Sequence, residues 1–452
     1  MLRLRQLTIR KYRDCEPCEL KFGPGQVFLL GMNGGGKTTL VELLSRLASL
    51  DLGFFENDTA DIDLDWSMTS ELHGVPFVVT TWSLRSTHRH LSQDYPLFPS
   101  VSAPSATRDW KISARIRAFV LSTALDTDTP KFDSWVASGD SDGVITVATS
   151  ETATEAAQTK KSRLAGPSQI LGAVMQLLAV TVGNVPDRPN LALAALTHNF
   201  IGPAVPRLDE ALVKFEAIIG QASPKITLLK SDPADLGMSF PVRVPLEVFR
   251  LTVGADAPTP PQLRSFAHYG IQSPGSDPPF SLRTELASLL GGAVEIVPVL
   301  ESEDADGSRT YSSFTFYVTW PDGSKQRHDA LSFGQKRMIA ALWHIACTPD
   351  RPVFTDELSN GLHAAWITRL LELLGDQQAF HATQNPLLLD LAGPGPAEKV
   401  ASRFVRCEVA LVEGKRRWRW RNPTAEEAAR INAGYEADFQ HLSDILQSEG
   451  LW

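Results

Sequence analysis

The chain has 452 residues, of which 43% are hydrophobic and 21% are charged, and its formal net charge at pH 7 is −9. This composition is typical of a globular protein of about two to three lobes and excludes a disordered or fibrous chain. The negative charge argues against a surface coated for nucleic acid, but it leaves room for one local basic patch.

The amino-terminal segment and the apolar content bear on cellular location. The segment "MLRLRQLTIRKYRD" alternates apolar and basic residues like a strand, and it lacks the apolar centre of a signal peptide. No window supplies the roughly 18 uninterrupted apolar residues that a membrane helix needs. Cys15 and Cys18 form a CxxC without the second ligand pair of a zinc site, so we expect no metal there. We expect a cytoplasmic protein that does not enter a membrane.

The first elements along the chain are predicted as strand, turn, strand and helix. Residues 3–12 ("RLRQLTIRKY") alternate like a strand, residues 22–25 contain turn residues, and residues 26–30 ("QVFLL") form a short apolar strand. The glycine-rich run "GMNGGGKT" follows, and after it leucines recur with helical spacing. A glycine-rich run between a strand and a helix is the setting of a phosphate-binding loop.

The remaining patterns divide the chain into three predicted parts. Residues 1–150 contain the glycine-rich run and then short β-branched strands, which predict a β subdomain. Residues 151–290 read as a mainly helical inserted domain, interrupted by segments rich in Pro and Gly. Residues 291–452 contain a hairpin, alternating strands and helices, and then another hairpin and a tail helix. This alternation predicts an α/β fold with a largely parallel sheet and no long coiled coil.

The run "GMNGGGKT", residues 31–38, matches every position of G-x-x-x-x-G-K-[ST]. Small residues let backbone N–H groups curl around phosphates, the lysine reaches the β- and γ-oxygens, and the hydroxyl ligates Mg²⁺. We therefore expect Thr38 to bind the metal. The nucleotide-binding set comprises Gly31, Asn33, Gly34, Gly35, Gly36, Lys37, Thr38 and Thr39.

A second motif, "PVFTDELSNGLH", begins with a short apolar strand and ends it in two adjacent carboxylates. At the end of such a strand Asp356 can hold Mg²⁺ through water, and Glu357 can polarise the attacking water. Asp-Glu after a strand is also common as a helix N-terminus. The matching phosphate loop favours catalysis here.

The order of four motifs resembles that of ABC-type ATPases. The phosphate loop, "LSFGQ", "VFTDE" with "SNGLH", and "ATQNP" follow one another in that order at the two ends of the chain. The wide separation of the first two resembles the RecF and SMC branch, and especially the OLD-like ATPase subunits of bacterial anti-phage systems such as PARIS or Septu. The resemblance implies an ABC-type ATPase head built from residues 1–150 and 291–452, with ATP and Mg²⁺ as cofactors.

The resemblance also implies roles for residues outside the two nucleotide motifs. In such ATPases the "LSFGQ" segment contacts ATP held by the other protomer, here through Ser332, Gly334 and Gln335. This implies a homodimer with two composite ATP sites, or a higher oligomer built on it. By the same match Arg13 lies near the nucleotide.

Other matched positions are less uniform. Ser359 and Asn360 would lie in the loop that crosses the dimer interface, and packing is the favoured role of His363. Two positions depart from the family: Phe333 replaces a signature glycine, and Gln384 stands where many members have a histidine. Gln384 can orient water but cannot carry a positive charge, so turnover is expected to be slow. For the Q-loop glutamine three candidates stay open, namely Gln158, Gln169 and Gln176.

The segment "GKRRWRWRNP" is the most basic stretch near the carboxyl end. Its alternation puts Trp418 and Trp420 on one face of a strand and arginines on the other. Either this is a half-buried edge strand kept soluble by arginine, or it is a surface for nucleic acid or an acidic partner.

No second active site is visible in the sequence. "THNF" lacks the neighbours of an HNH nuclease, and no TOPRIM motif follows the carboxylate strand. We therefore expect an ATP-gated sensor or scaffold with a separate nuclease or toxin effector of TOPRIM or HNH type. The alternative is a RecF/SMC-like DNA-repair ATPase that binds duplex DNA directly. A transporter motor is disfavoured because its signature follows the phosphate loop more closely.

Overall fold

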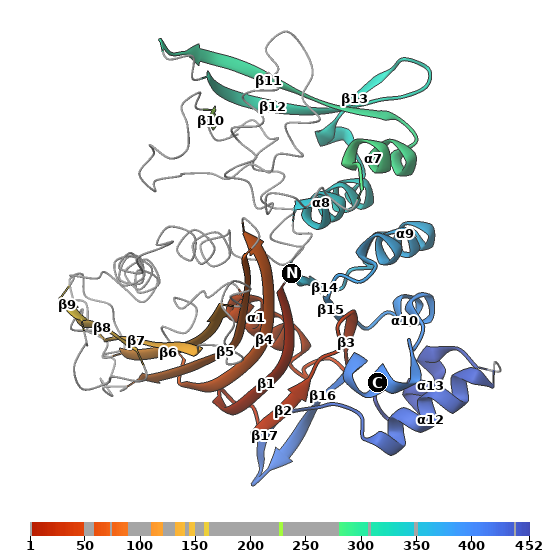
Figure 1. Ribbon diagram of the computed structural model, residues 1–452. Coiled ribbons are helices and arrows are strands. Elements are labelled where there is room, and N and C mark those ends of the chain that lie inside the picture. Colours follow the sequence, from red (N-terminus) through yellow and green to blue (C-terminus); the bar gives the residue numbers. More distant parts are fainter. Residues whose placement is uncertain are drawn as a thin grey trace, which may run out of the picture.

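The structure is a computed structural model that describes residues 2–48, 58–72, 75–88, 110–120, 132–140, 144–149, 158–161, 226–228, 280–305, 309–347, 351–437 and 440–452. The strands of these residues form a largely parallel central sheet, a long antiparallel sheet and a smaller antiparallel sheet. Figure 1 shows the central sheet between the long antiparallel sheet and the C-terminal helices.

The central sheet has the strand order β14 (Val353–Asp356), β15 (Ala379–Ala382), β3 (Gln26–Leu30), β16 (Phe404–Val412) and β17 (Lys415–Arg421). The first four strands are parallel, and β17 pairs antiparallel with β16. Strand β15 is buried along its whole length and β3 along most of it, as expected where both faces of a sheet are covered. Because these strands are parallel, the loops that follow β3, β14 and β15 meet at one edge.

The long antiparallel sheet has the order β2 (Cys18–Lys21), β1 (Leu2–Tyr12), β4 (Ala60–Leu72), β5 (Val75–His88), β6 (Trp110–Val120), β7 (Phe132–Asp140), β8 (Val144–Thr149) and β9 (Gln158–Lys161). Gln378 connects this sheet to the central one: its amide accepts from Leu4 N at 2.7 Å and donates to Leu4 O at 2.8 Å. The two ends of the chain are thereby joined in one head.

The third sheet contains β10 (Ile226–Leu228), β12 (Arg309–Thr319), β11 (Ala293–Glu303) and β13 (Lys325–Arg327). Asp322 accepts from the backbone and hydroxyl of Ser324 in the turn between β12 and β13, which confirms the predicted hairpin. Helix α7 (Leu282–Leu290) packs on β11 and is capped by Ser281. This sheet leads directly into the "LSFGQ" segment.

Helices cover both faces of the central sheet. Helix α1 (Lys37–Ala48) packs against β14 and β15, and Figure 1 shows it on the side of the long antiparallel sheet. The other described helices are α8 (Phe333–Cys347), α9 (Ala364–Leu374), α10 (Pro386–Ala392), α11 (Val400–Arg403), α12 (Ala425–Glu436) and α13 (Leu442–Ser448), with short 3-10 turns at His328–Ala330 and Ala397–Lys399.

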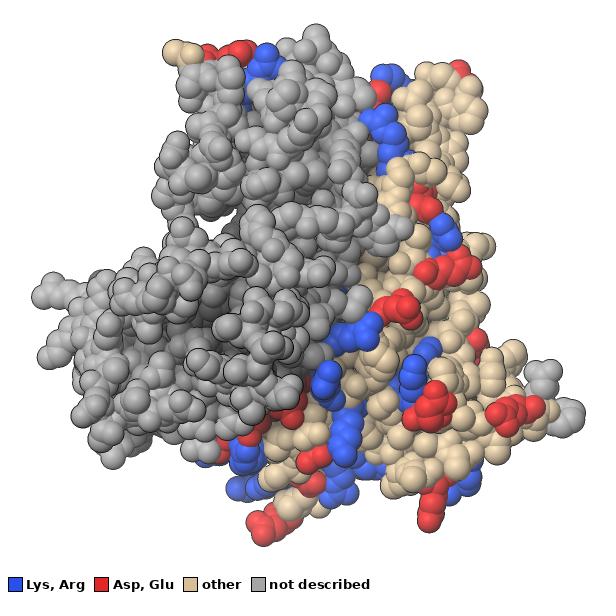
Figure 2. Space-filling view, viewed as in Figure 1, with Lys and Arg blue, Asp and Glu red and all other residues tan. Residues whose placement is uncertain are grey.

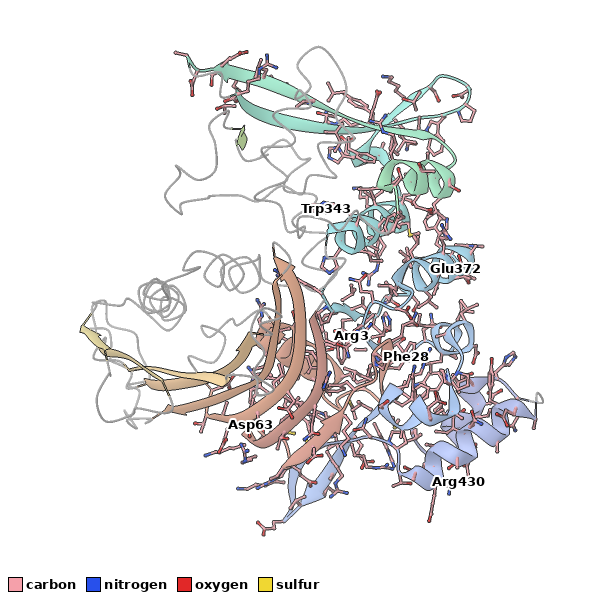
Figure 3. All side chains as sticks on the ribbon, in the orientation of Figure 1. Arg3, Phe28, Asp63, Trp343, Glu372 and Arg430 are labelled. Carbon is pink, nitrogen blue, oxygen red and sulfur yellow. The ribbon has the colours of Figure 1, made fainter. Side chains whose placement is uncertain are left out.

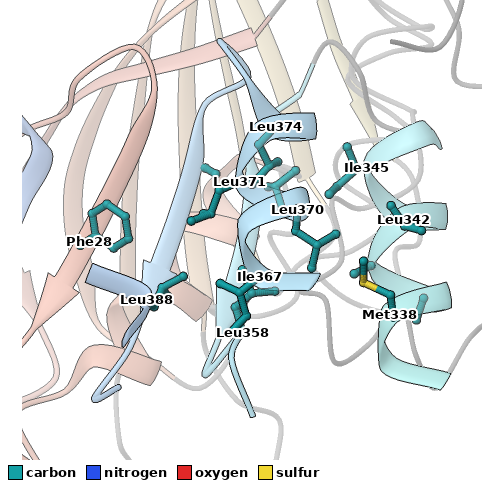
Figure 4. Close-up of a cluster of buried hydrophobic side chains, with 14 of the residues drawn as sticks. Phe28, Met338, Leu342, Ile345, Leu358, Ile367, Leu370, Leu371, Leu374 and Leu388 are labelled. Carbon is teal, nitrogen blue, oxygen red and sulfur yellow. The ribbon is translucent and has the colours of Figure 1, made fainter. Parts of the chain in front are cut away.

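One apolar core links these helices to the sheet. Figure 4 shows side chains of α8 and α9 facing each other, with Leu388 of α10 and Phe28 of β3 on the other side of α9, and Figure 3 labels Phe28 where sheet and helix side chains converge. Aliphatic residues at helical spacing give α9 one buried face, formed by Ile367, Leu370, Leu371 and Leu374. Burial of such side chains, at about 1.5–3 kcal/mol each, is the main stabilisation of the layered head.

The predicted fold class is confirmed: mixed α/β, with a parallel-type sheet, flanking helices and an antiparallel β subdomain. Strand β4 was not predicted. Of the predicted helical insertion at residues 151–290, the described residues are β9, β10, residues 280–281 and α7. The rest of the insertion, including Gln169 and Gln176, lies outside the described residues. In the described segments no helix is both long enough and apolar enough to cross a bilayer.

Candidate active site

The phosphate loop, residues 31–38, connects the end of β3 to the start of α1, as the motif predicts. Gly34 and Gly36 have positive φ angles of 85° and 84°, so the chain alternates between backbone conformations that gather N–H groups into a concave anion-binding surface. A Cβ at Gly31 or Gly35 would overlap the carbonyl oxygen of Cys407. The glycines therefore let the loop lie directly on β16.

Two tryptophans of β17 support the loop from the same side. The Trp418 indole N–H donates to Gly34 O and the Trp420 N–H donates to Gly35 O, each at 3.0 Å. Their rings stack with centroids 5.9 Å apart, and a Cβ on Gly36 would stand 3.0 Å from the Trp418 ring. Sequence reasoning placed both tryptophans on one face of a strand, but it could not identify the phosphate loop as what that face contacts.

Lys37 is buried and folds back over its own loop. Its ammonium group donates to Gly31 O at 2.6 Å and to Met32 O at 3.2 Å. Burial lowers the pKa of Lys37 below its ordinary value, whereas Glu357 and Asp356 are near enough for their charges to oppose that shift. The structure thus brings the predicted phosphate-binding cation and the two predicted carboxylates into one electrostatic neighbourhood.

The two carboxylates occupy the end of β14. Because β14 and β3 are both parallel to β15, Asp356 lies at the same sheet edge as the phosphate loop. Glu357 follows with φ of 51°, a left-handed conformation that is uncommon outside glycine. Its N–H donates to Ala382 O at 2.8 Å. Unusual backbone geometry of this kind is often found at functional sites.

Gln384 lies beside Glu357. Its backbone N–H and its side-chain amide donate to the two carboxylate oxygens of Glu357, at 3.4 Å and 3.3 Å respectively. These long contacts can hold the carboxylate while leaving it accessible to a water molecule. The two residues named from separate motifs are therefore neighbours in space.

The signature turn, residues 331–335, begins α8. Ser332 Oγ accepts from the Gln335 N–H at 3.2 Å, and the Gln335 side chain accepts from the Ser332 N–H at 2.8 Å. This is a reciprocal capping arrangement. Phe333 is 59% exposed. The turn packs against the end of the loop that follows the two carboxylates, because a Cβ on Gly334 would overlap the Gly361 carbonyl oxygen.

Two further predicted residues, Arg13 and His363, have local partners, and a third, Ser359, is buried. Arg13, with φ of 43°, pairs with Asp58 and lies over the Tyr12 ring. Ser359 is buried, and its hydroxyl has no hydrogen-bond partner among the described residues, whereas His363 caps α9 by accepting from Ala365 N at 3.3 Å.

Thr38 and Asp356 are the residues that would hold Mg²⁺. Thr38 is exposed at the first turn of α1, and Asp356 is half-buried across the loop from it. A hydroxyl and a carboxylate are ligands that suit this hard cation. The concave N–H surface of the phosphate loop, together with Lys37, suits a triphosphate. The residues present therefore fit MgATP, whose cation would neutralise phosphate charge.

Comparison with known proteins agrees with this arrangement. Residues 251–390 match the family described as "AAA domain, putative AbiEii toxin, Type IV TA system", a range that contains the signature turn, both carboxylates and Gln384. A curated relative, the DNA replication and repair protein RecF of Magnetococcus marinus, is 42% identical over 48 residues. That match covers 11% of this chain and only 13% of the relative.

Solved structures of SMC heads are also similar. An SMC head bound to the C-terminal winged-helix domain of ScpA has 15% identity and a TM-score of 0.41, covering 94% of this chain and 99% of that one. The SMC head domain from Thermotoga maritima has 12% identity and a TM-score of 0.35, covering 92% and 98%. These scores are low, so the fold assignment rests on the topology itself. The AAA-domain match covers residues 251–390 and the RecF match covers 48 residues, so each shows similarity over only part of the chain.

Proposed function

We propose that the chain binds and hydrolyses ATP with Mg²⁺ and works as an ATP-gated head. The observation that carries this is the convergence at one sheet edge of the glycine nest, Lys37, Asp356, Glu357 and Gln384. Lys37 binds the phosphates, Glu357 accepts a proton from water, and Gln384 orients the carboxylate. Because Gln384 cannot carry a positive charge, turnover is slow.

The test of nucleotide binding is Lys37→Ala. Removal of a charge-assisted phosphate contact of about 1.5–3 kcal/mol should weaken MgATP binding by roughly 10- to 100-fold. Isothermal titration with ATP measures the affinity directly. The control is Lys399→Ala, which removes an exposed lysine from the 3-10 turn at Ala397–Lys399. Undiminished affinity in Lys37→Ala contradicts the assignment of the phosphate loop.

The working unit in this proposal is a homodimer with two composite sites. Two strongly exposed apolar side chains support it, because Met32 of the phosphate loop is 81% exposed and Phe333 of the signature turn is 59% exposed. A head-to-head pair would cover both and bring Ser332 to the partner's nucleotide. Ser332→Arg should keep ATP binding by the single head but stop hydrolysis. Full turnover by that variant excludes composite sites.

We further propose that the head acts as a sensor or scaffold in anti-phage defence, with a separate nuclease or toxin as effector. This role rests on the motif resemblance alone. On the visible described face, Figure 2 shows Lys and Arg interspersed with Asp and Glu, which does not favour a broad DNA-binding face.

Co-purification of the chain with the products of neighbouring genes tests the role. Recovery of a nuclease or toxin supports defence. Duplex DNA binding that weakens with salt and stimulates ATP hydrolysis would instead support direct DNA repair.

A further inference from the structure

The signature turn is in direct contact with the loop that carries the catalytic carboxylate. That loop, residues 357–361 and here called the carboxylate loop, ends at Gly361 with φ of 75°. A Cβ on Gly334 would overlap the Gly361 carbonyl oxygen, and a Cβ on Gly361 would stand 2.8 Å from the Phe333 ring. The first turn of α8 and the end of the carboxylate loop therefore have no space between them.

Arg337 makes a second connection one turn further along α8. Its guanidinium Nη2 donates to Asp356 O at 3.1 Å and to Glu357 O at 2.7 Å. The side chain is only 6% exposed, so these hydrogen bonds are shielded from water. A charged donor in such a setting forms a stronger hydrogen bond than a neutral one.

The conformation of Glu357 depends on such support. A left-handed backbone in a non-glycine residue costs on the order of 1–3 kcal/mol and persists where neighbouring groups hold it. Glu357 is held on one side by its N–H bond to Ala382 O and on the other by Arg337. Loss of the Arg337 bonds would let the peptide rotate and carry the carboxylate away from Gln384.

We propose that Arg337 is a positioning residue that couples the signature turn to Glu357. In the dimer, the nucleotide bound by the second copy contacts Ser332 and Gly334 and thereby sets the position of α8. Arg337 transmits that position to Glu357, which acts on this chain's own nucleotide. The coupling rests on the proposed function, because it requires composite ATP sites. Each site is then sensitive to occupation of the other.

This arrangement has a measurable consequence. Coupling between two identical sites makes ATP hydrolysis cooperative, so turnover by the wild-type chain should rise with ATP concentration with a Hill coefficient above 1. Arg337→Met should retain MgATP affinity within about twofold while turnover falls roughly 10- to 100-fold, less than full loss of a general base. Its Hill coefficient should return to 1. Arg337→Lys keeps a donor and should recover part of the rate.

Two other variants separate coupling from general damage. Arg369→Met removes a guanidinium that pairs with Glu285 away from the site, and it should change neither cooperativity nor turnover. Gly361→Ala forces the carboxylate loop away from Phe333 without touching Arg337, and it should also lower the Hill coefficient. Gly361→Ala keeps the test available if Arg337→Met does not fold.

Specific results would overturn the coupling. Non-cooperative hydrolysis by the wild-type dimer is one, and unchanged cooperativity in both Arg337→Met and Gly361→Ala is another. An equal loss of ATP affinity and turnover in Arg337→Met would show a structural role only. Failure of the wild-type chain to bind ATP is a different result, because it refutes the proposed function itself.

Discussion

The phosphate loop and the signature turn are both short polar segments at the start of a helix, but their surroundings differ. Behind the phosphate loop lie Cys407, Trp418 and Trp420, and Lys37 is bonded to the loop's own carbonyls. The signature turn, by contrast, leaves Phe333 largely in solvent and satisfies its polar groups by capping its own helix.

This difference shows which half of the site a single chain can complete. The phosphate loop is held by contacts within the same chain, so its geometry exists before any ligand binds. Ligand binding therefore costs little further conformational entropy in this loop. The signature turn is linked to the rest of the chain by Leu331 in the apolar core and by the carboxylate loop behind it. Its outer surface, where Phe333 is exposed, is the part that a second copy would cover in the proposed dimer.

Glu357→Gln should have the largest effect, because Glu357 lies between the two halves. The variant keeps the side-chain shape but cannot accept a proton, so turnover should fall by roughly 10²- to 10⁴-fold while MgATP binding persists. ATP turnover and the ATP-dependent size of the protein in solution should be measured together. We expect the variant to accumulate as an ATP-bound dimer. If Glu357→Gln hydrolyses ATP at the wild-type rate, another group positions the water, and Gln384 is the first candidate.

Trp420→Phe tests the internal support of the phosphate loop. Loss of the buried N–H donor to Gly35 O should lower the free energy of unfolding by about 1–3 kcal/mol and weaken ATP binding. Trp418→Phe is the matched control: its acceptor, Gly34 O, is exposed, so water can replace the indole and the loss should be smaller. Equal losses in the two variants would contradict the difference in burial.

Phe333→Ser tests whether a second copy covers the outer surface of the signature turn. In the single chain this exposed side chain contributes little, so the free energy of unfolding should stay within about 0.5 kcal/mol. If a second copy covers the ring, ATP-dependent dimerisation should weaken by about 1.5 kcal/mol, or roughly tenfold. Sedimentation of the variant with ATP measures this, and an unchanged dimer would place Phe333 outside the interface.

The smallest effect is expected from pH, through the sheet beneath the phosphate loop. Burial, reinforced by the charge of Arg403, lowers the pKa of His381 to about 3. Between pH 3 and 6.5 the unfolded chain binds the proton and the folded chain does not, so stability falls as pH decreases. Between pH 8 and pH 6 the free energy of unfolding should drop by about 1 kcal/mol from this group.

His381→Gln should remove that part of the pH dependence, as measured by urea unfolding at several pH values. The exposed His441→Gln should leave it in place. Identical pH profiles for wild type and His381→Gln would mean that folding does not shift the pKa of His381, which contradicts its lowering by burial.

Local patterns were sufficient for much of the head. The spacing of glycines and Lys37 between a strand and a helix identified the phosphate loop, and an apolar strand ending in Asp356 and Glu357 identified the carboxylates. Alternation of strands and helices predicted the mixed α/β class. These features succeeded because each is determined by neighbours in sequence: backbone periodicity, turn chemistry and the short reach of a side chain.

Contacts between distant parts of the chain were decided only by the tertiary structure. The indoles of Trp418 and Trp420 meet glycines almost four hundred residues earlier, with sequence separations of 384 and 385. Arg337 reaches the carbonyls of Asp356 and Glu357 across two elements, and Glu357 adopts a left-handed backbone that its residue type does not favour. Such pairings depend on how strands β3, β14 and β16 assemble into one sheet, and periodicity within a segment carries no information about which other segment its face will meet.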